Sequence, residues 1–284
     1  QMVPDYSIAA SERFDLLLEI AKAGGRPVSF TFMHRSEAID GKPEWQQMVD
    51  NMDAARDEGL QIRGQMIPRP VGGMLGLELS YHPFSLNPSY KEIADLPLAE
   101  KVERMKDPEF RKRLIAEEPA DPQPFYMQIV SEIEAMYVLG EPPNYNPDKS
   151  QSIAARARAM GVDPKELIYD SLLERGGHEV LYRPMGNDEG DKFDAAGRNL
   201  LQNEFTIPAL GDGGAHYSVI CDAAYTTYIL TYWHQHADED HKIDLPILIR
   251  KLSMEPAQTV GLNDRGVLKA GYKADVNVID MESL

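Results

Sequence analysis

The chain has 284 residues and a formal net charge of −17, from 29 lysines and arginines against 46 aspartates and glutamates. This acidity argues against a nucleic-acid partner, because binding a phosphate backbone relies on lysine and arginine side chains. No stretch approaches the about 20 consecutive apolar residues of a membrane helix, so we expect no membrane contact. The single cysteine, Cys221, excludes an internal disulfide framework. It suits a reducing compartment, so we expect the protein in the cytoplasm.

The first seventy residues alternate between β-rich runs and segments with apolar residues at helical spacing. The pattern predicts a strand, helix, strand, helix and strand over 1–4, 11–24, 27–33, 43–59 and 60–67. The second helix begins after a proline and ends at Gly59, as helices commonly do. Such alternation predicts βαβ units and a parallel sheet.

Residues 68–205 interrupt this pattern with short helices and proline-rich connections. We expect two helices within 98–118, broken at Pro108, and two more over 150–161 and 164–175. So long an excursion is usually functional, such as an insertion that covers a binding face. A contact between copies is the alternative, and we also expect a homo-oligomer.

The alternation resumes with a strand over 206–210, which leads into the sequence GDGGAH at 211–216. Helices are expected over 218–235, 245–253 and 256–262. In the tail, residues 266–268 and 273–279 alternate with period two, which predicts β-structure outside the parallel sheet.

Asp212 is the strongest candidate for chemistry, because reactive groups gather at the carboxyl ends of parallel strands. It stands among glycines, including Gly213 and Gly214, and this suits a backbone that approaches a ligand closely. With His216, four residues on, it can ligate a divalent metal or act as a general base. The alternatives are that Asp212 caps the next helix and that His216 is a surface histidine.

Arg69 follows the strand at 60–67 between two prolines, which stiffen the backbone and hold the guanidinium in place. It can bind a substrate carboxylate, and Gln65 is expected to point to the same carboxyl edge of the sheet. A structural salt bridge of Arg69 is the alternative. The other histidines and the cysteine carry weaker expectations. His34 is expected to be hydrogen-bonded and His82 to belong to a lid, while His234, His236 and His241 suit a solvated surface better than a metal site and Cys221 suits a buried structural thiol.

Several segments together resemble a known family. The tail NDRGVLKAGYKADVNVIDMESL carries Gly-x-Leu-x-x-Gly-x-x-Ala-Asp, a signature of the amidohydrolase superfamily. With LGDGGAHYSVICDAAYTTYILTYW, KLSMEPAQTVGLNDRG, RPVSFTFMHR, GLQIRGQMIPRPVGG and YHPFSLNPSY, it is similar to the N-acyl-D-amino-acid deacylase, or D-aminoacylase-like, branch. The resemblance covers nearly the whole chain.

This resemblance implies a TIM-type (β/α)8 barrel that uses one or two divalent metals, usually zinc, to activate a water for amide hydrolysis. Asp212 matches the family's aspartate after strand eight, which implies that it is general base, then proton donor to the leaving amine, and a metal contact. His216 is then expected to assist at the metal. The small-molecule substrate is expected to be an N-acyl-D-amino acid or a related amide.

The sequence also departs from the family. The His-x-His after strand one, the bridging residue after strand four and the histidines after strands five and six are missing, unless His34 substitutes. The four countable strands are best assigned as strands five to eight. We therefore expect residues 1–262 to form the carboxyl half of a barrel, with an insertion at 68–205, and 263–284 to begin a small β-sandwich.

The amino half of the barrel is then expected on an upstream segment or on another chain, which agrees with a chain that opens at Gln1 without a signal segment. Half a barrel leaves two open sheet edges. The alternative function is a binding or assembly subunit of the same fold that has lost its metal site.

Overall fold

The structure is a computed structural model that describes residues 1–5, 8–33, 38–39, 41–120, 127, 130–186, 191–209, 211, 219–220 and 223–284. It divides into two compact units. Unit 1 comprises Gln1–Pro70, Glu189–Gly211 and Asp222–Leu284, and unit 2 comprises Val71–Asp188 and Asp212–Cys221. Each unit is described by itself.

The centre of unit 1 is a parallel sheet whose strands lie in chain order. Strands β1 (Val28–Phe32), β4 (Ile62–Met66) and β8 (Thr206–Pro208) are adjacent in the order β1-β4-β8, and both pairs are parallel. Met2 adds a parallel bridge to Phe30, so the first segment lies beside β1. The predicted parallel arrangement of these four segments is confirmed.

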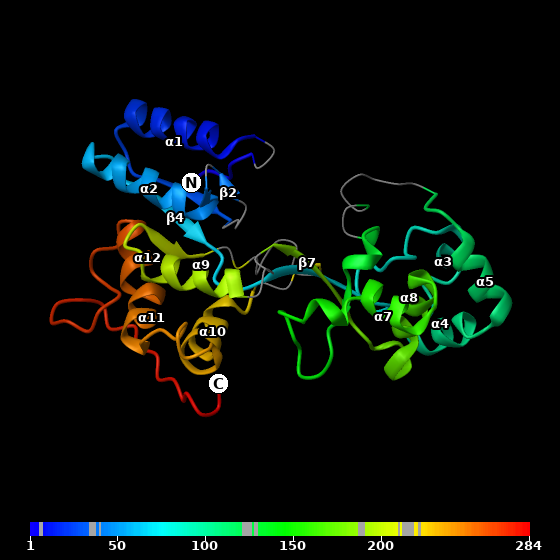
Figure 1. Cartoon of the computed structure of the whole chain (residues 1–284). Helices are drawn as coiled ribbons and strands as arrows, with labels where there is room; N and C mark the ends of the chain where they lie inside the picture. The colour runs from blue at the N-terminus through cyan, green and yellow to red at the C-terminus, as the bar shows by residue number, and fades with distance from the viewer. Residues whose placement is uncertain are drawn as a thin grey trace. The chain divides into compact units, whose positions relative to one another are not determined.

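Helices α1 (Ala10–Gly24) and α2 (Glu44–Asp57) lie next to each other and cover one face of this sheet (Figure 1). They bury an apolar core with the strands, whose members include Phe14, Leu17, Phe30, Phe32, Met52, Ile62 and Met66. Because successive strand residues point to opposite faces, Ser29, Thr31 and Gln65 lie on the other face. The sheet is therefore apolar toward its helices and largely polar on its second face.

The rest of unit 1 is mainly helical. A short hairpin pairs β2 (Ala38–Ile39) with β3 (Lys42–Pro43). The other helices are α9 (Asp191–Gln202), α10 (Tyr225–Leu230), η4 (Thr231–His236, a π-helix), α11 (Leu245–Leu252) and α12 (Met254–Thr259). The helix predicted from residue 218 begins only at Tyr225. Its expected start pairs with β5 of unit 2 instead, because Ile220 bridges Gly73 and Met74 N donates to Val219 O.

Unit 2 has its own core and an antiparallel sheet that the sequence pattern did not predict. Its sheet has the order β5 (Val71–Leu75), β7 (Leu181–Gly186), β6 (Tyr137–Val138). The predicted helices are confirmed as α4 (Leu98–Met105), α5 (Pro108–Ala116), α7 (Ile153–Met160) and α8 (Pro164–Leu173). Shorter elements are α3 (Pro88–Lys91), η1 (Ile133–Ala135), η2 (Lys149–Gln151) and η3 (Glu174–Gly177).

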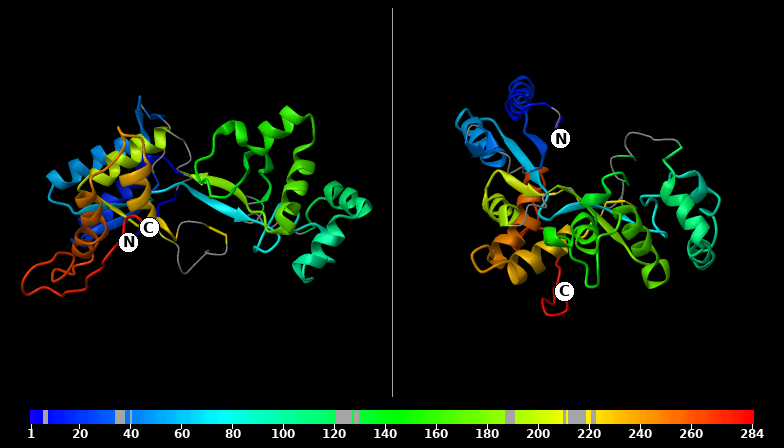
Figure 2. Two further views of the ribbon diagram at one scale, coloured as in Figure 1. Left: turned by 90° about the horizontal axis from the view of Figure 1, so that it is seen from below. Right: turned by 45° about the vertical axis from the view of Figure 1, so that its right-hand side comes forward.

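The tail after α12 forms no strand in residues 260–284, all of which the structure describes. The expectation of β-structure at 266–268 and 273–279 is therefore wrong for this chain by itself. Figures 1 and 2 show the tail, in orange to red, as a loop. A strand needs a neighbour for its backbone hydrogen bonds, and here Val276 and Val278 are 59% and 97% exposed.

The chain thus has a mixed α/β fold. That its parallel strands are strands five to eight of a barrel, and that a β-sandwich begins at 263, remain predictions. The long segment of unit 2, Val71–Asp188, lies within the insertion predicted at 68–205. In the described part of the chain, no helix is both long and apolar enough to cross a membrane.

Candidate functional site

The site predicted from the sequence lies at the carboxyl edge of the parallel sheet. Met66 and Pro208, the last residues of β4 and β8, are paired in register, and Ala209 N donates to Met66 O at 3.0 Å. Arg69 follows Met66 by three residues, and Gly211 follows Pro208 by three. The two connections therefore leave neighbouring strands at the same edge.

Asp212, Gly213, Gly214 and His216 lie outside the residues that the structure describes, as do His34 and Cys221. The structure describes the chain up to Ala209 and then Gly211, so it locates the strand from which the GDGGAH sequence departs. The roles of these residues stay predictions.

Arg69 lies in a segment that is held from two sides. Trp233 Nε1 donates to Pro68 O at 2.7 Å, and the Arg69 Nε donates to Pro70 O at 3.3 Å. The Arg69 guanidinium carbon lies 5.5 Å from the centroid of the Tyr228 ring, which is a cation–π distance. Arg69 is only 1% exposed. Its guanidinium therefore has a defined position, as the flanking prolines suggested.

Gln65 lies within β4 and not beyond its end. Its Nε2 donates to Ser29 Oγ at 3.1 Å, and its Oε1 accepts from Gln1 Nε2 at 2.8 Å. Both ends of the amide thus take part in a polar ladder across the second face of the sheet. Gln65 lies in β4 and Arg69 in the segment that follows it, and the two side chains have different surroundings. A substrate-binding role for either stays a prediction.

An aromatic cluster behind Arg69 was not identified from the sequence. Tyr228 and Tyr232 stack with ring centroids 4.8 Å apart and an angle of 15° between the rings. The Tyr232 hydroxyl donates to Asp194 Oδ1 at 2.8 Å and lies 2.9 Å from Oδ2. The spacing of the two tyrosines by four residues was the available signal, since such residues share one helix face.

Trp233 packs against a residue that has no side chain. A Cβ atom on Gly197 of α9 would lie 2.6 Å from two atoms of the Trp233 ring, so only glycine permits this approach. Trp233 is fully buried, and the centroid of its ring lies 5.6 Å from that of the Phe193 ring. Helix α9 thus fixes the indole that holds Pro68.

The other histidines do not form a site in the described part of the chain. His82 is buried in unit 2, where its Nδ1 accepts from Phe84 N at 3.3 Å and its ring lies 4.1 Å from that of Tyr90. Burial, together with the charge of Lys101, lowers the pKa of His82 from 6.5 to about 3. His82 is thus a neutral imidazole in the core of unit 2, and its expected place in a lid stays a prediction.

His234 lies with its Nδ1 at 3.2 Å from Ile243 O, and His236 is exposed. Over the described ranges, no group of three or more His, Cys, Asp or Glu residues is placed to hold a metal ion. This finding includes His234, His236 and His241, which are all described.

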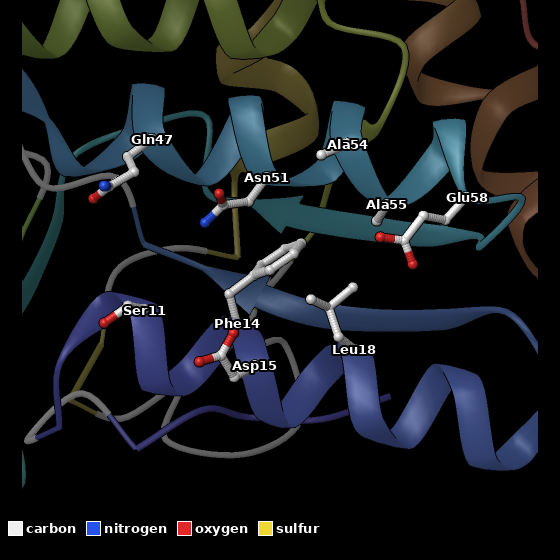
Figure 3. A pocket seen from close by; sticks show the side chains of 9 residues that line it. All are labelled: Ser11, Phe14, Asp15, Leu18, Gln47, Asn51, Ala54, Ala55 and Glu58. Carbon is white, nitrogen blue, oxygen red and sulfur yellow. The ribbon is translucent and has the colours of Figure 1, made fainter.

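A groove of about 210 Å³ lies between α1 and α2 (Figure 3). The residues labelled in Figure 3 belong to the two helices and to Glu58, which follows α2, so the groove is on the helix side of the sheet. Its lining is mixed, with side chains that include Phe14, Asp15, Leu18, Asn51 and Glu58. Neither Gln65 nor Arg69 lines it, so it is separate from the predicted site.

The chain matches one family model and has similar solved structures. The family model described as the amidohydrolase family matches residues 5–284. A structure from a study of the binuclear metal center of D-aminoacylase has 12% sequence identity and a TM-score of 0.46. Another D-aminoacylase structure, described as defining a novel subset of amidohydrolases, has 13% identity and the same TM-score. Each match covers 93% of this chain, which spans only 42% of the length of those structures. A search of curated proteins finds no match.

Proposed function

The chain belongs to the amidohydrolase family, and from this premise we propose that it forms part of a metal-dependent hydrolase that cleaves an amide bond. The substrate class we propose is the N-acyl-D-amino acids or a related amide. The observation that supports this most directly is the shared carboxyl edge of β4 and β8, from which Arg69 and the GDGGAH sequence both depart. In parallel α/β folds this edge carries the chemistry.

Asp212 is proposed as the general base and acid. Its carboxylate takes a proton from the water whose oxygen attacks the amide carbon, and it returns a proton to the amine nitrogen as the carbon–nitrogen bond breaks. Gly213 and Gly214 have no side chains to obstruct the approach of substrate to the backbone. This division of roles needs one carboxylate at the edge of the sheet.

Asp212 and His216 are donors of the types that zinc accepts, a carboxylate oxygen and an imidazole nitrogen. Two donors do not complete a zinc site, so the remaining ligands are proposed to lie outside this chain, on the amino half of the barrel. When bound, one or two divalent ions, proposed to be zinc, supply Lewis acidity toward the amide carbonyl and lower the pKa of water. The protein residues proposed to hold them are Asp212 and His216.

Arg69 is proposed to bind the carboxylate of the amino-acid part, since a guanidinium can offer two parallel N–H groups to a carboxylate. Gln65, in the strand that precedes Arg69, is also proposed to contact the substrate. Its amide already bridges Gln1 and Ser29, so any substrate contact would exchange one of these hydrogen bonds.

The remaining strands of the site are proposed to come from the amino half of a barrel, on an upstream segment or on another chain. The polar second face of the unit 1 sheet, with Ser29, Thr31 and Gln65, is the face that such strands would enclose. The short parallel bridge of Met2 and the strand β8 form the two sides of the sheet that a barrel would close.

The test is metal analysis and turnover of the complete enzyme, with N-acetyl-D-amino acids as substrates. We expect a bound divalent ion and hydrolysis that falls by about 10²–10⁴-fold in Asp212→Asn, with the fold retained. A stable and fully active Asp212→Asn enzyme would remove this residue from the mechanism. If the complete protein binds no divalent ion and hydrolyses none of these substrates, a non-catalytic binding or assembly role is favoured instead.

A further inference from the structure

Four side chains from different elements of unit 1 make a continuous chain of contacts. Asp194 on α9 accepts a hydrogen bond from the hydroxyl of Tyr232 on η4, at 2.8 Å. The Tyr232 ring stacks on the ring of Tyr228 from α10, with centroids 4.8 Å apart. The face of Tyr228 lies 5.5 Å from the guanidinium carbon of Arg69.

Each contact in this series limits the movement of the next side chain. Asp194 is 6% exposed, so its hydrogen bond with Tyr232 is shielded from water. The π-helix η4 follows α10 directly and places the two tyrosines so that their rings are within 15° of parallel. The Tyr228 ring therefore has a fixed plane, and a guanidinium packed against it takes a defined orientation.

The contact of Arg69 with Tyr228 is an attraction between the ring and the charge of the guanidinium, so the contact itself needs none of the N–H donors. The N–H groups of a guanidinium form a rigid planar fork, which matches a carboxylate only when the group is held in one position. A lysine ammonium has no such fork.

We propose that Tyr228, Tyr232 and Asp194 are positioning residues, which orient the Arg69 guanidinium toward a carboxylate group of the substrate. The inference rests on the proposed function and adds a specificity device to it. The stack selects substrates that carry a carboxylate over otherwise identical ones that do not. Its members act through Arg69 and do not contact the scissile amide.

The test uses the complete enzyme and two matched substrates, an N-acetyl-D-amino acid and its carboxamide, which lacks the negative charge. In Tyr228→Leu we expect KM for the carboxylate substrate to rise about tenfold, with kcat within about twofold. Tyr232→Phe keeps both rings and removes only the hydrogen bond to Asp194, so we expect a smaller rise, about fivefold. The kinetics of the carboxamide should not change in either variant.

The matched control is Tyr272→Leu, which breaks a pair of the same kind in the tail, where Lys269 Nζ lies 5.1 Å from the Tyr272 ring centroid. It should leave both substrates unaffected. An unchanged KM for the carboxylate substrate in Tyr228→Leu and Tyr232→Phe overturns the inference while the proposed function stands. Equal losses on both substrates also overturn it, because they indicate a merely structural role. If the unmutated enzyme hydrolyses neither substrate, the proposed function fails and the inference fails with it.

Discussion

Two buried side chains, Lys251 of unit 1 and His82 of unit 2, are accommodated in different ways. In unit 1, Lys251 is fully buried, but its ammonium donates to Asn203 O at 2.6 Å and Thr206 O at 2.8 Å and lies 2.6 Å from the Glu255 carboxylate. In unit 2, His82 is equally buried, and its Nε2 has no hydrogen-bond partner among the described residues. Unit 1 therefore keeps a charge inside by surrounding it with acceptors, whereas unit 2 keeps its histidine uncharged.

This difference decides how each unit responds to change. If a buried cation is removed, its acceptors stay buried without a hydrogen-bond partner, and this lowers the stability at every pH. A neutral buried histidine instead makes stability depend on pH, because the unfolded chain binds a proton that the folded chain excludes. The predictions below test this contrast, with both units observed in the intact chain.

Lys251→Met should have the largest effect. It removes the buried cation from two backbone carbonyls and from Glu255, which keeps only the 46% exposed Arg250. Breaking a buried pair costs about 3–5 kcal/mol of the free energy of unfolding. Urea unfolding should report the loss, and hydrogen exchange should locate it in β8 of unit 1 and not in β5 and β7 of unit 2.

Arg250→Met is the matched control, because Arg250 pairs with the same Glu255 at 2.8 Å but its side chain is 46% exposed. This variant should lose no more than about 1 kcal/mol of the free energy of unfolding. Equal losses in the two variants would show that the buried contacts of Lys251 do not stabilise unit 1.

Gly72→Ala should destabilise unit 2 by up to about 3 kcal/mol, measured by urea unfolding. An added Cβ would lie 2.2 Å from the Tyr182 ring and 2.6 Å from the backbone oxygen of Arg183, which cannot move without disturbing β7. Gly24→Ala, at the end of α1, has no atom within 4 Å and should be neutral or slightly stabilising. A neutral Gly72→Ala would contradict the close pairing of β5 with β7.

His82 should make unit 2 less stable in acid. Its pKa in the folded chain, about 3, lies below its ordinary value of 6.5. Its contribution is therefore complete above pH 6.5 and is lost as the pH falls from 6.5 toward 3, by about 2 kcal/mol at pH 5. In His82→Asn, which keeps an acceptor for Phe84 N, this part of the pH dependence should disappear.

The measurement is the difference in unfolding free energy between the wild type and His82→Asn across pH 4–7, with hydrogen exchange assigning it to unit 2. The largest group of other titrating residues, the carboxylates, is common to both proteins and cancels in the difference. A difference that does not change with pH would show that the pKa of His82 is the same in the folded and the unfolded chain.

Hydrophobic periodicity was enough to predict the parallel part of the fold. Strands β1, β4 and β8 and helices α1 and α2 all lie where their apolar spacing placed them, because each buries one face against the others. The antiparallel strands β5 and β7 were missed. Gly72, Gly73 and Pro184 weaken the strand pattern in the sequence, and these segments become strands only by pairing with each other across more than a hundred residues.

The candidate site divides in the same way. The sequence identified Arg69 and the strand end that precedes it, since flanking prolines and strand order are local signals. It did not reveal the cluster of Tyr228, Tyr232 and Asp194, whose members meet only when α9, α10 and η4 pack together.

By itself, then, the sequence identified the family through its motifs. It also predicted the parallel strands and the edge at which chemistry is expected, because the spacing of apolar residues is a local signal. The tertiary structure alone decided that the tail remains without a strand, that residues 219–220 pair with β5, and that Arg69 packs against Tyr228. Such contacts join residues far apart in the chain. Their free energy depends on which surfaces fold against each other, and no local pattern records that.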